Sequence, residues 1–222
     1  MPGSRAGLGL AVHGTTIYAA GGKIFNSARS PNLSPTSRIE RYDVVKGCWE
    51  KVEPMIDPHF TCCAVFLDNR MYVFCGANRY DTSLHIVQVY DPNDNSWQVG
   101  KPMSMCRYAD AVVVLDGYIY VMGGWTAGDR VSYVERFAPE TGQWEEMPKM
   151  GKERTFFGAT VMNGKIYVCG GSCRGQDSSS VQVYHETTGT WEYGAELGAG
   201  KCDAAAVVVS LPAVEHSLVT KK

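Results

Sequence analysis

The feature that most limits how this chain can fold is a spacing that recurs along almost its whole length. Four tryptophans follow one another at steps of 48, 47 and 47 residues, at Trp49, Trp97, Trp144 and Trp191. Seven residues before each tryptophan stands an aromatic residue, and earlier in every unit comes a pair of small residues, usually two glycines. A fixed period of this length indicates repeated supersecondary units, each of which buries its apolar face by stacking against its neighbours.

Each unit has the pattern of four short strands rather than of helices. In the third unit, apolar residues 111–115 and 118–122 flank Asp116-Gly117, a dipeptide typical of the two-residue turn of a β-hairpin. Residues 133–137 and 144–147 continue the pattern as a third and a fourth strand, with a turn between them. Three such connections within one repeat predict a four-stranded antiparallel meander, which is one blade of a β-propeller.

The repeated positions resemble those of the kelch repeat, whose marks are a double glycine with a tyrosine and a tryptophan at fixed distances. The small-residue pairs are Gly21-Gly22, Cys75-Gly76, Gly123-Gly124 and Gly170-Gly171. A tyrosine precedes the second glycine of each pair by four residues, at Tyr18, Tyr72, Tyr120 and Tyr167. The resemblance implies an all-β, kelch-type β-propeller, with two mild departures from the pattern at Cys75 and Phe137.

We expect four four-stranded antiparallel blades plus one extra C-terminal strand, which together make a partial ring. The expected boundaries are blades at about 6–55, 56–103, 104–150 and 151–197, a closing strand at 202–211 and a polar tail at 212–222. Kelch-like proteins usually close a six-bladed ring, so the resemblance implies the C-terminal part of a longer protein, without about two blades. The alternative is that the four blades close a strained ring of their own.

The composition is that of an ordinary globular domain, with 45% hydrophobic residues, 20% charged residues and a net charge of −2. This balance argues against nucleic acid or an anionic membrane as a partner. No apolar run approaches the ~18–20 residues of a membrane-spanning helix, and the N-terminus has no apolar signal-peptide core. The eight cysteines form no Cys-x-x-Cys pair and several lie in apolar runs, so we expect reduced thiols and a cytoplasmic protein.

The sequence offers no catalytic motif, so we expect no enzymatic activity, no cofactor and no metal. It contains no Gly-x-x-x-x-Gly-Lys-[Ser/Thr] phosphate loop, no Gly-x-Ser-x-Gly nucleophile motif and no His-Glu-x-x-His zinc motif. Cys169 and Cys173 lack a second pair that would complete a zinc site. Cys173 lies beside Arg174 and could be a reactive thiol, although we favour an ordinary loop thiol.

Binding is expected at the loops after the second strand of each blade and at the loops between blades, because both surround one face of a propeller. The candidates after second strands are Arg29, Asn78, Arg79, Tyr80, Trp125, Arg130 and Arg174. The candidates between blades are His59, Arg107, Tyr108, Arg154 and Phe156. Arginine beside exposed aromatic residues is typical of interface hot spots.

Two of these predictions carry an alternative. Trp125 lies outside the tryptophan repeat, which favours a binding role, but it could instead pack over its own blade. A basic residue recurs in every unit at the position of His59, Arg107 and Arg154. For Arg107 and Arg154 we therefore favour a structural role over partner binding.

The expected function is that of a non-catalytic protein-interaction propeller, whose arginines and aromatics grip an acidic or phosphorylated segment of a protein or peptide target. The kelch-like resemblance implies substrate recognition for a cullin-RING E3 ubiquitin ligase, with the cullin bound through a BTB domain that this sequence does not include. The alternative is a cytoskeletal, actin-type scaffold or binding protein that acts independently of ubiquitination.

Overall fold

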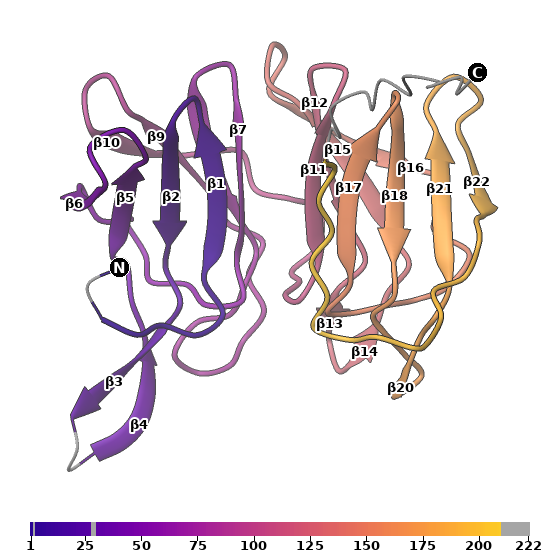
Figure 1. Ribbon diagram of the computed structural model, residues 1–222, viewed down its shortest axis with the longest axis horizontal. Helices are drawn as coiled ribbons and strands as arrows, with labels where there is room; N and C mark the ends of the chain where they lie inside the picture. Colours follow the sequence, from indigo (N-terminus) through magenta and orange to yellow (C-terminus); the bar gives the residue numbers. More distant parts are fainter. Residues whose placement is uncertain (2, 28–29, 210–222) are drawn as a thin grey trace, which may run out of the picture.

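The computed structural model describes residues 1, 3–27 and 30–209, and within these residues every regular element is a β-strand (Figure 1). Four antiparallel, four-stranded sheets follow one another along the chain. The predicted all-β propeller architecture is confirmed. The first sheet consists of β1 (Gly9–His13), β2 (Thr16–Ala20), β5 (Ile39–Asp43) and β6 (Cys48–Val52).

The next three sheets repeat this order, with the first strand at one edge and the fourth strand at the other. The second blade consists of β7 (Cys63–Leu67), β8 (Arg70–Phe74), β9 (Val87–Asp91) and β10 (Ser96–Val99). The third consists of β11 (Ala111–Leu115), β12 (Tyr118–Met122), β15 (Val134–Ala138) and β16 (Gln143–Met147). The fourth consists of β17 (Gly158–Met162), β18 (Lys165–Cys169), β21 (Val181–His185) and β22 (Thr190–Tyr193).

Three short hairpins lie in the connections between second and third strands. They are β3 (Lys23–Ser27) with β4 (Ser30–Pro35), β13 (Trp125–Thr126) with β14 (Asp129–Arg130), and β19 (Ser172–Cys173) with β20 (Gln176–Asp177). The connection between Gly22 and Tyr42 is longer than its counterparts in the other units and forms the β3–β4 hairpin, which projects away from the first blade (Figure 1).

The turn predicted at Asp116-Gly117 is confirmed, and Asn163-Gly164 forms the equivalent turn in the fourth blade. Asp116 and Gly117 have φ of +47° and +78°, and Asn163 and Gly164 have φ of +51° and +68°. Two successive positive φ values match the right-handed twist of the flanking strands, and Asp-Gly and Asn-Gly tolerate them best.

The repeated aromatic residues pack against each other within a blade and tie it to the preceding blade. The rings of Tyr184 and Trp191 lie 5.1 Å apart, as do those of Phe137 and Trp144. The Trp191 indole Nε1 donates to the carbonyl of Pro148 at 2.8 Å, where the last strand of the third blade has just ended. The indole therefore both fills apolar space and satisfies its polar group across the junction.

The double-glycine position needs a small residue because another chain segment passes close to it. A side chain on Gly123 would place its Cβ 2.8 Å from the Arg154 carbonyl oxygen, and Gly123 also has φ of +59°. Cys75 occupies the same place in the second blade with φ of +55°. Its thiol is buried and donates to Asp110 Oδ2 at 2.8 Å, which gives the substituted side chain a polar partner.

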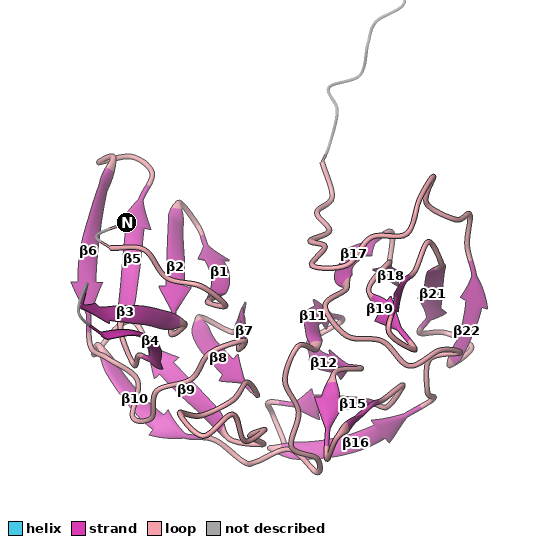
Figure 2. Cartoon of the chain, turned by 90° about the horizontal axis from the view of Figure 1, so that it is seen from below, coloured by secondary structure: helices cyan, strands magenta, loops and turns pink. Residues whose placement is uncertain are grey.

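The four blades form an arc with open ends (Figure 2). First strands line its inner side, where β1 contacts β7, β7 contacts β11 and β11 contacts β17. Since β1 and β17 stand at the two ends of the arc, the alternative of a self-closed four-bladed ring is wrong. Leu10 and Val12 of β1 are 60% and 63% exposed, whereas Ala64, at the equivalent of Leu10 in the second blade, is 8% exposed. The difference arises because the first blade covers Ala64.

The expected closing strand at 202–211 is not formed over residues 202–209, which belong to none of the sheets in the described part of the chain. This segment follows β17: the Ala204 amide donates to the Phe156 carbonyl at 3.3 Å, and Ala206 passes directly beside Gly158. A strand needs a neighbouring second strand to complete its hydrogen bonds, and the described residues supply none here. Residues 210–222 lie outside the described part of the chain.

Candidate partner-binding face

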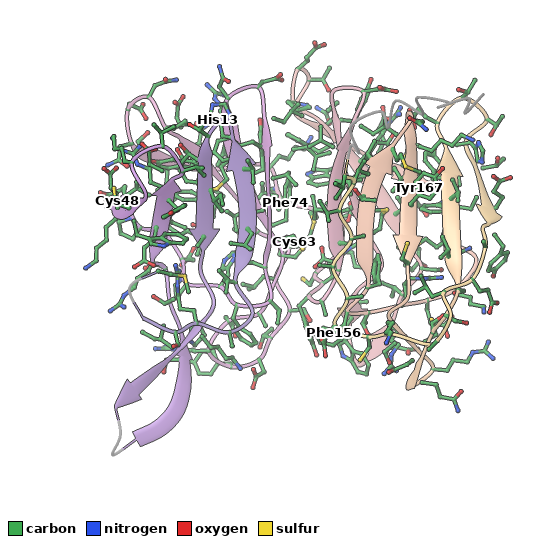
Figure 3. The ribbon with its side chains drawn as sticks, viewed as in Figure 1. His13, Cys48, Cys63, Phe74, Phe156 and Tyr167 are labelled. Atoms are coloured by element: carbon green, nitrogen blue, oxygen red, sulfur yellow. The ribbon has the colours of Figure 1, made fainter. Side chains whose placement is uncertain are left out.

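Loops from neighbouring blades meet on one face, at the lower end of the molecule in Figure 1. Antiparallel bridges join each inter-blade segment to the loop after a second strand, at Phe60–Ala77, Tyr108–Trp125 and Thr155–Ser172. The predicted convergence of the two kinds of loop is thus present. Figure 3 shows Phe156 at this end and His13 at the opposite one. We call this surface the loop face, and it consists of residues 77–85, 104–109, 125–130, 151–156 and 172–177.

In the second blade, the loop face presents an arginine stacked on a tyrosine. Tyr80 is 70% exposed, and the Arg79 guanidinium lies 4.8 Å from the centre of its ring while donating to its hydroxyl at 2.7 Å. Asn78 is half-buried, and its Oδ1 accepts from the amides of Tyr80 and Thr82 at 2.9 and 3.2 Å. Asn78 therefore shapes the loop, whereas Arg79 and Tyr80 are available to a partner.

In the third blade, a second arginine–aromatic pair lies on the hairpin β13–β14. Trp125 and Arg130 are cross-strand partners, and the guanidinium lies 4.9 Å from the centre of the indole. Both are half-buried. Trp125 therefore packs against Arg130 of its own hairpin and also lines an open groove of about 590 Å³ with Met105, Cys106 and Tyr108. A binding role for Trp125 stays a prediction.

The remaining exposed candidates lie beside the fourth blade. Arg174 is exposed and its Nε donates to Glu153 Oε1 at 3.3 Å across the face. Phe156 is 40% exposed with φ of +53°, and its amide donates to the Ala109 carbonyl at 3.0 Å. Tyr108 is half-buried, and Arg29 lies outside the described residues.

Three predicted binding residues, His59, Arg107 and Arg154, are not on the surface. Each is at most 1% exposed, so their assignment to partner contact is corrected by the structure. The Arg107 amide donates to the Leu84 carbonyl of the second blade at 2.9 Å, while the Arg107 side chain reaches into the third blade. There the guanidinium donates to the Gly123 and Tyr133 carbonyls and forms a buried ion pair with Glu135.

The same crossing occurs at His59 and Arg154. Arg5 holds the equivalent position at the start of the first blade, and we call Arg5, His59, Arg107 and Arg154 the inner basic column. Arg154 donates to the Gly170 carbonyl at 2.8 Å and to Gln182 Oε1 at 3.0 Å. Arg5 forms an ion pair with Glu40 at 2.9 Å. His59, Arg107 and Arg154 therefore join neighbouring blades, which confirms the structural role favoured for Arg107 and Arg154.

Sequence reasoning missed the partners of this column, although a signal for them was present. Strand three of each blade carries a buried Glu or Gln that faces the basic residue: Glu40, Gln88, Glu135 and Gln182. These four residues recur at steps of 48, 47 and 47, the same as the tryptophans. A polar residue that keeps the register of buried aromatics inside an apolar strand indicates a buried partner.

Burial perturbs two titratable groups, His59 at the junction between the first and second blades and Asp110 at the junction between the second and third. It lowers the pKa of His59 to about 4, because desolvation disfavours the imidazolium. It raises the pKa of Asp110 to about 6, because desolvation disfavours the carboxylate more than the Cys75 hydrogen bond and Arg107 favour it. Both groups lie behind the loop face rather than on it, so they bear on stability rather than on ligand contact.

Within the described residues, no group of three or more His, Cys, Asp or Glu side chains is arranged to hold a metal ion. All eight cysteines are free thiols. No helix long and apolar enough to span a bilayer occurs in the part of the chain that the structure describes. The loop face therefore offers cationic, aromatic and hydrogen-bonding groups for binding.

Comparison with known proteins finds similarity to kelch-repeat proteins. The family model described as the KLHDC2/KLHL20/DRC7 Kelch-repeats domain matches residues 7–211. Human Kelch-like protein 33 is 30% identical over 111 residues, covering 50% of this chain and 20% of that protein. Kelch repeat and BTB domain-containing protein 12 of Danio rerio is 28% identical over 130 residues, covering 51% and 20%.

A further relative is Beta-scruin of Limulus polyphemus, 27% identical over 132 residues, covering 56% of this chain and 14% of that protein. The chain thus spans a fifth or less of the length of these three relatives. The solved structure of YjhT superposes with a TM-score of 0.82 at 14% sequence identity, covering 92% of this chain and 75% of that one. At this identity the likeness shows the propeller fold alone.

Proposed function

Because the chain belongs to the kelch-repeat family of the KLHDC2/KLHL20/DRC7 Kelch-repeats domain, we propose that its loop face binds a protein or peptide target without catalysis or cofactor. The observation that carries the proposal is the pair of arginine–aromatic stacks, Arg79 on Tyr80 and Arg130 on Trp125. Interface hot spots are rich in these residue types.

The chemistry of the stacks favours an acidic or phosphorylated segment as the target. A guanidinium presents a rigid fork of donors that matches a carboxylate or phosphate, and stacking on an aromatic ring holds the fork in place before the ligand arrives. Pre-ordering of this kind lowers the entropy lost on binding. Arg174, which is exposed, adds a third guanidinium on the same face.

Affinity capture with three matched variants tests this assignment. We expect Arg79→Ala and Arg130→Ala each to weaken target binding by roughly tenfold or more, the scale of a hot-spot residue. Arg70→Ala is the matched control. Arg70 lies beside the β7–β8 turn, away from the loop face, where it is half-exposed and its Nε lies 3.7 Å from Asp91 Oδ2. Binding that survives both loop-face changes, or that falls equally in the control, would contradict the proposal.

We further propose that the target is delivered to a cullin-RING E3 ubiquitin ligase in a cytoplasmic, reducing compartment. Support comes from the similarity to Kelch repeat and BTB domain-containing protein 12, whose name includes a BTB domain, and from eight free thiols. The test is co-purification of a cullin with the complete product of the parent gene. Absence of any cullin from that complex would remove the ligase role while leaving target binding intact.

A second candidate is a cytoskeletal, actin-type scaffold that acts independently of ubiquitination. The similarity to Beta-scruin supports this second candidate, because the name of that relative mentions neither a Kelch-like protein nor a BTB domain. Co-sedimentation with actin filaments distinguishes the two, because only the scaffold requires saturable binding to filaments by the 222-residue chain.

A further inference from the structure

A cysteine and a histidine meet at the edge of the groove that Trp125 lines. Cys106 Sγ lies 3.1 Å from Nδ1 of His85. His85 precedes β9 in the second blade and is exposed, while Cys106 lies half-buried in the segment between the second and third blades. A thiol at this distance from an imidazole nitrogen can donate its proton to the ring, which is the arrangement of a nucleophile with its base.

The backbone holds this pair in place from both sides. The amide of Met103 donates to the His85 carbonyl at 2.9 Å, and the amide of Arg107 donates to the Leu84 carbonyl at 2.9 Å. Arg107, next to Cys106, is fixed by its buried ion pair with Glu135. Two backbone hydrogen bonds and a buried anchor therefore hold the two segments that carry His85 and Cys106 side by side.

The other cysteines differ in access or in surroundings. Burial raises the pKa of Cys62 to about 11 and raises the pKa of Cys63 and of Cys75 as well. Cys202 is exposed, but its hydrogen bond with Asp177 raises its pKa. Among the described residues, Cys106 is the cysteine whose sulfur lies within hydrogen-bonding distance of a histidine ring. Accessibility and a neighbouring base coincide at this position.

The groove beside the thiol indicates what could reach it. Cys106 shares the groove with Met105, Tyr108 and Trp125, which give it one apolar wall, while Ser83 and Ser104 add hydroxyl groups. A small molecule with an apolar chain and one carbonyl oxygen fits such a lining. A soft carbon electrophile is also the natural reaction partner of a sulfur nucleophile.

We propose that Cys106 and His85 form a covalent modification site for α,β-unsaturated carbonyl compounds with a short apolar chain. The sulfur attacks the β-carbon while the S–H bond breaks and Nδ1 of His85 takes the proton. The carbon–carbon π bond becomes an enolate, and the proton then passes to its α-carbon. One C–S bond and one C–H bond form, and no oxidant, reductant or leaving group is needed.

The test uses the 222-residue chain treated with limiting trans-2-hexenal, followed by peptide mass spectrometry to obtain a rate for each cysteine. Cys48 is the internal control, because it is exposed and no histidine lies within hydrogen-bonding distance of its sulfur among the described residues. We expect Cys106 to be modified about tenfold faster than Cys48, a smaller factor than the ~100-fold or more of typical general-base catalysis because Cys106 is half-buried whereas Cys48 is exposed. A Cys106 rate equal to or below that of Cys48 would overturn the proposal.

A variant at the base separates reactivity from simple exposure. His85→Asn keeps a polar side chain of similar size but removes the base, and the exposed position leaves folding intact. The expected result is a Cys106 rate lower by about tenfold, with the Cys48 rate unchanged. An unchanged Cys106 rate would show that His85 has no part in the site. Unfolding midpoints equal to those of the unsubstituted chain confirm that the two proteins are compared in the same folded state.

Discussion

The arginines of the inner basic column and those of the loop face are the same residue type in two opposite settings. Arg107 is 1% exposed, crosses a blade junction and meets a buried carboxylate. Arg79, on a loop of the neighbouring blade, is exposed and stacks on Tyr80. The Arg107 guanidinium is buried among protein acceptors, while the Arg79 guanidinium donates to the Tyr80 hydroxyl and keeps its remaining donors exposed. The difference separates residues that hold the propeller together from residues that can bind a target.

The largest effect should follow from breaking the column at its charged pair. Arg107→Met leaves Glu135 buried without its partner, which should lower the free energy of unfolding by about 3–5 kcal/mol. Urea unfolding measures this value. The double variant Arg107→Met/Glu135→Leu should recover a large part of the loss, because it removes the uncompensated charge. A single variant that loses less than about 1 kcal/mol would mean that the pair does not pin the blades.

The two buried titratable groups should give stability opposite dependences on pH. The unfolded chain binds a proton at His59 below about pH 6.5, whereas the folded chain binds it only near pH 4, so acidification through this window is destabilising. Asp110 keeps its proton up to about pH 6 when folded but releases it near pH 3.8 when unfolded, so raising the pH through that window is destabilising.

Variants isolate each of these contributions. In Asp110→Asn, the free energy of unfolding should fall by up to about 3 kcal/mol from pH 7 to pH 4. In His59→Gln, it should fall by up to about 3 kcal/mol from pH 4 to pH 7. Chemical unfolding at four pH values gives both slopes, with Arg79→Ala as a control that keeps the slope of the parent chain. Slopes of the same sign in the two variants would refute the assignment.

A smaller effect is expected where the column meets an uncharged partner. Arg154→Met leaves the Gln182 amide and the Gly170 carbonyl without donors but buries no unpaired charge, so the expected loss is about 2 kcal/mol. The measurement is the same urea unfolding as for Arg107→Met. If Arg154→Met were the more damaging of the two, charge would not be what distinguishes the junctions.

The smallest effect on stability is expected at the loop face. Arg79→Ala should change the free energy of unfolding by less than about 0.5 kcal/mol, because an exposed stack contributes little to folding. The same change should weaken target binding, as described above. A loss of stability comparable to that of Arg154→Met would mean that Arg79 is a structural arginine. That result would contradict its assignment to target binding.

Much of the fold was predictable because the same residue types recur at a fixed spacing along the sequence. The tryptophan steps and the double glycines located the four blades, and the Asp116-Gly117 turn located the first two strands of the third, since each is a local requirement of a twisted hairpin. The open ends of the arc were expected as well. The β3–β4 hairpin was not predicted, because its residues carry no alternating pattern that distinguishes a strand from a loop.

The candidate site also has a part that the sequence could predict and a part that it could not. Local sequence could place Arg79, Trp125 and Arg130 on loops, and could suggest from their recurrence that Arg107 and Arg154 are structural. Only the tertiary structure decided that Arg107 reaches Glu135 in the next blade, and that His85 meets Cys106 across a junction. Such pairs join residues 28 and 21 positions apart. Strand geometry is a property of neighbours along the chain, whereas burial and side-chain partners depend on how one blade stacks on the next.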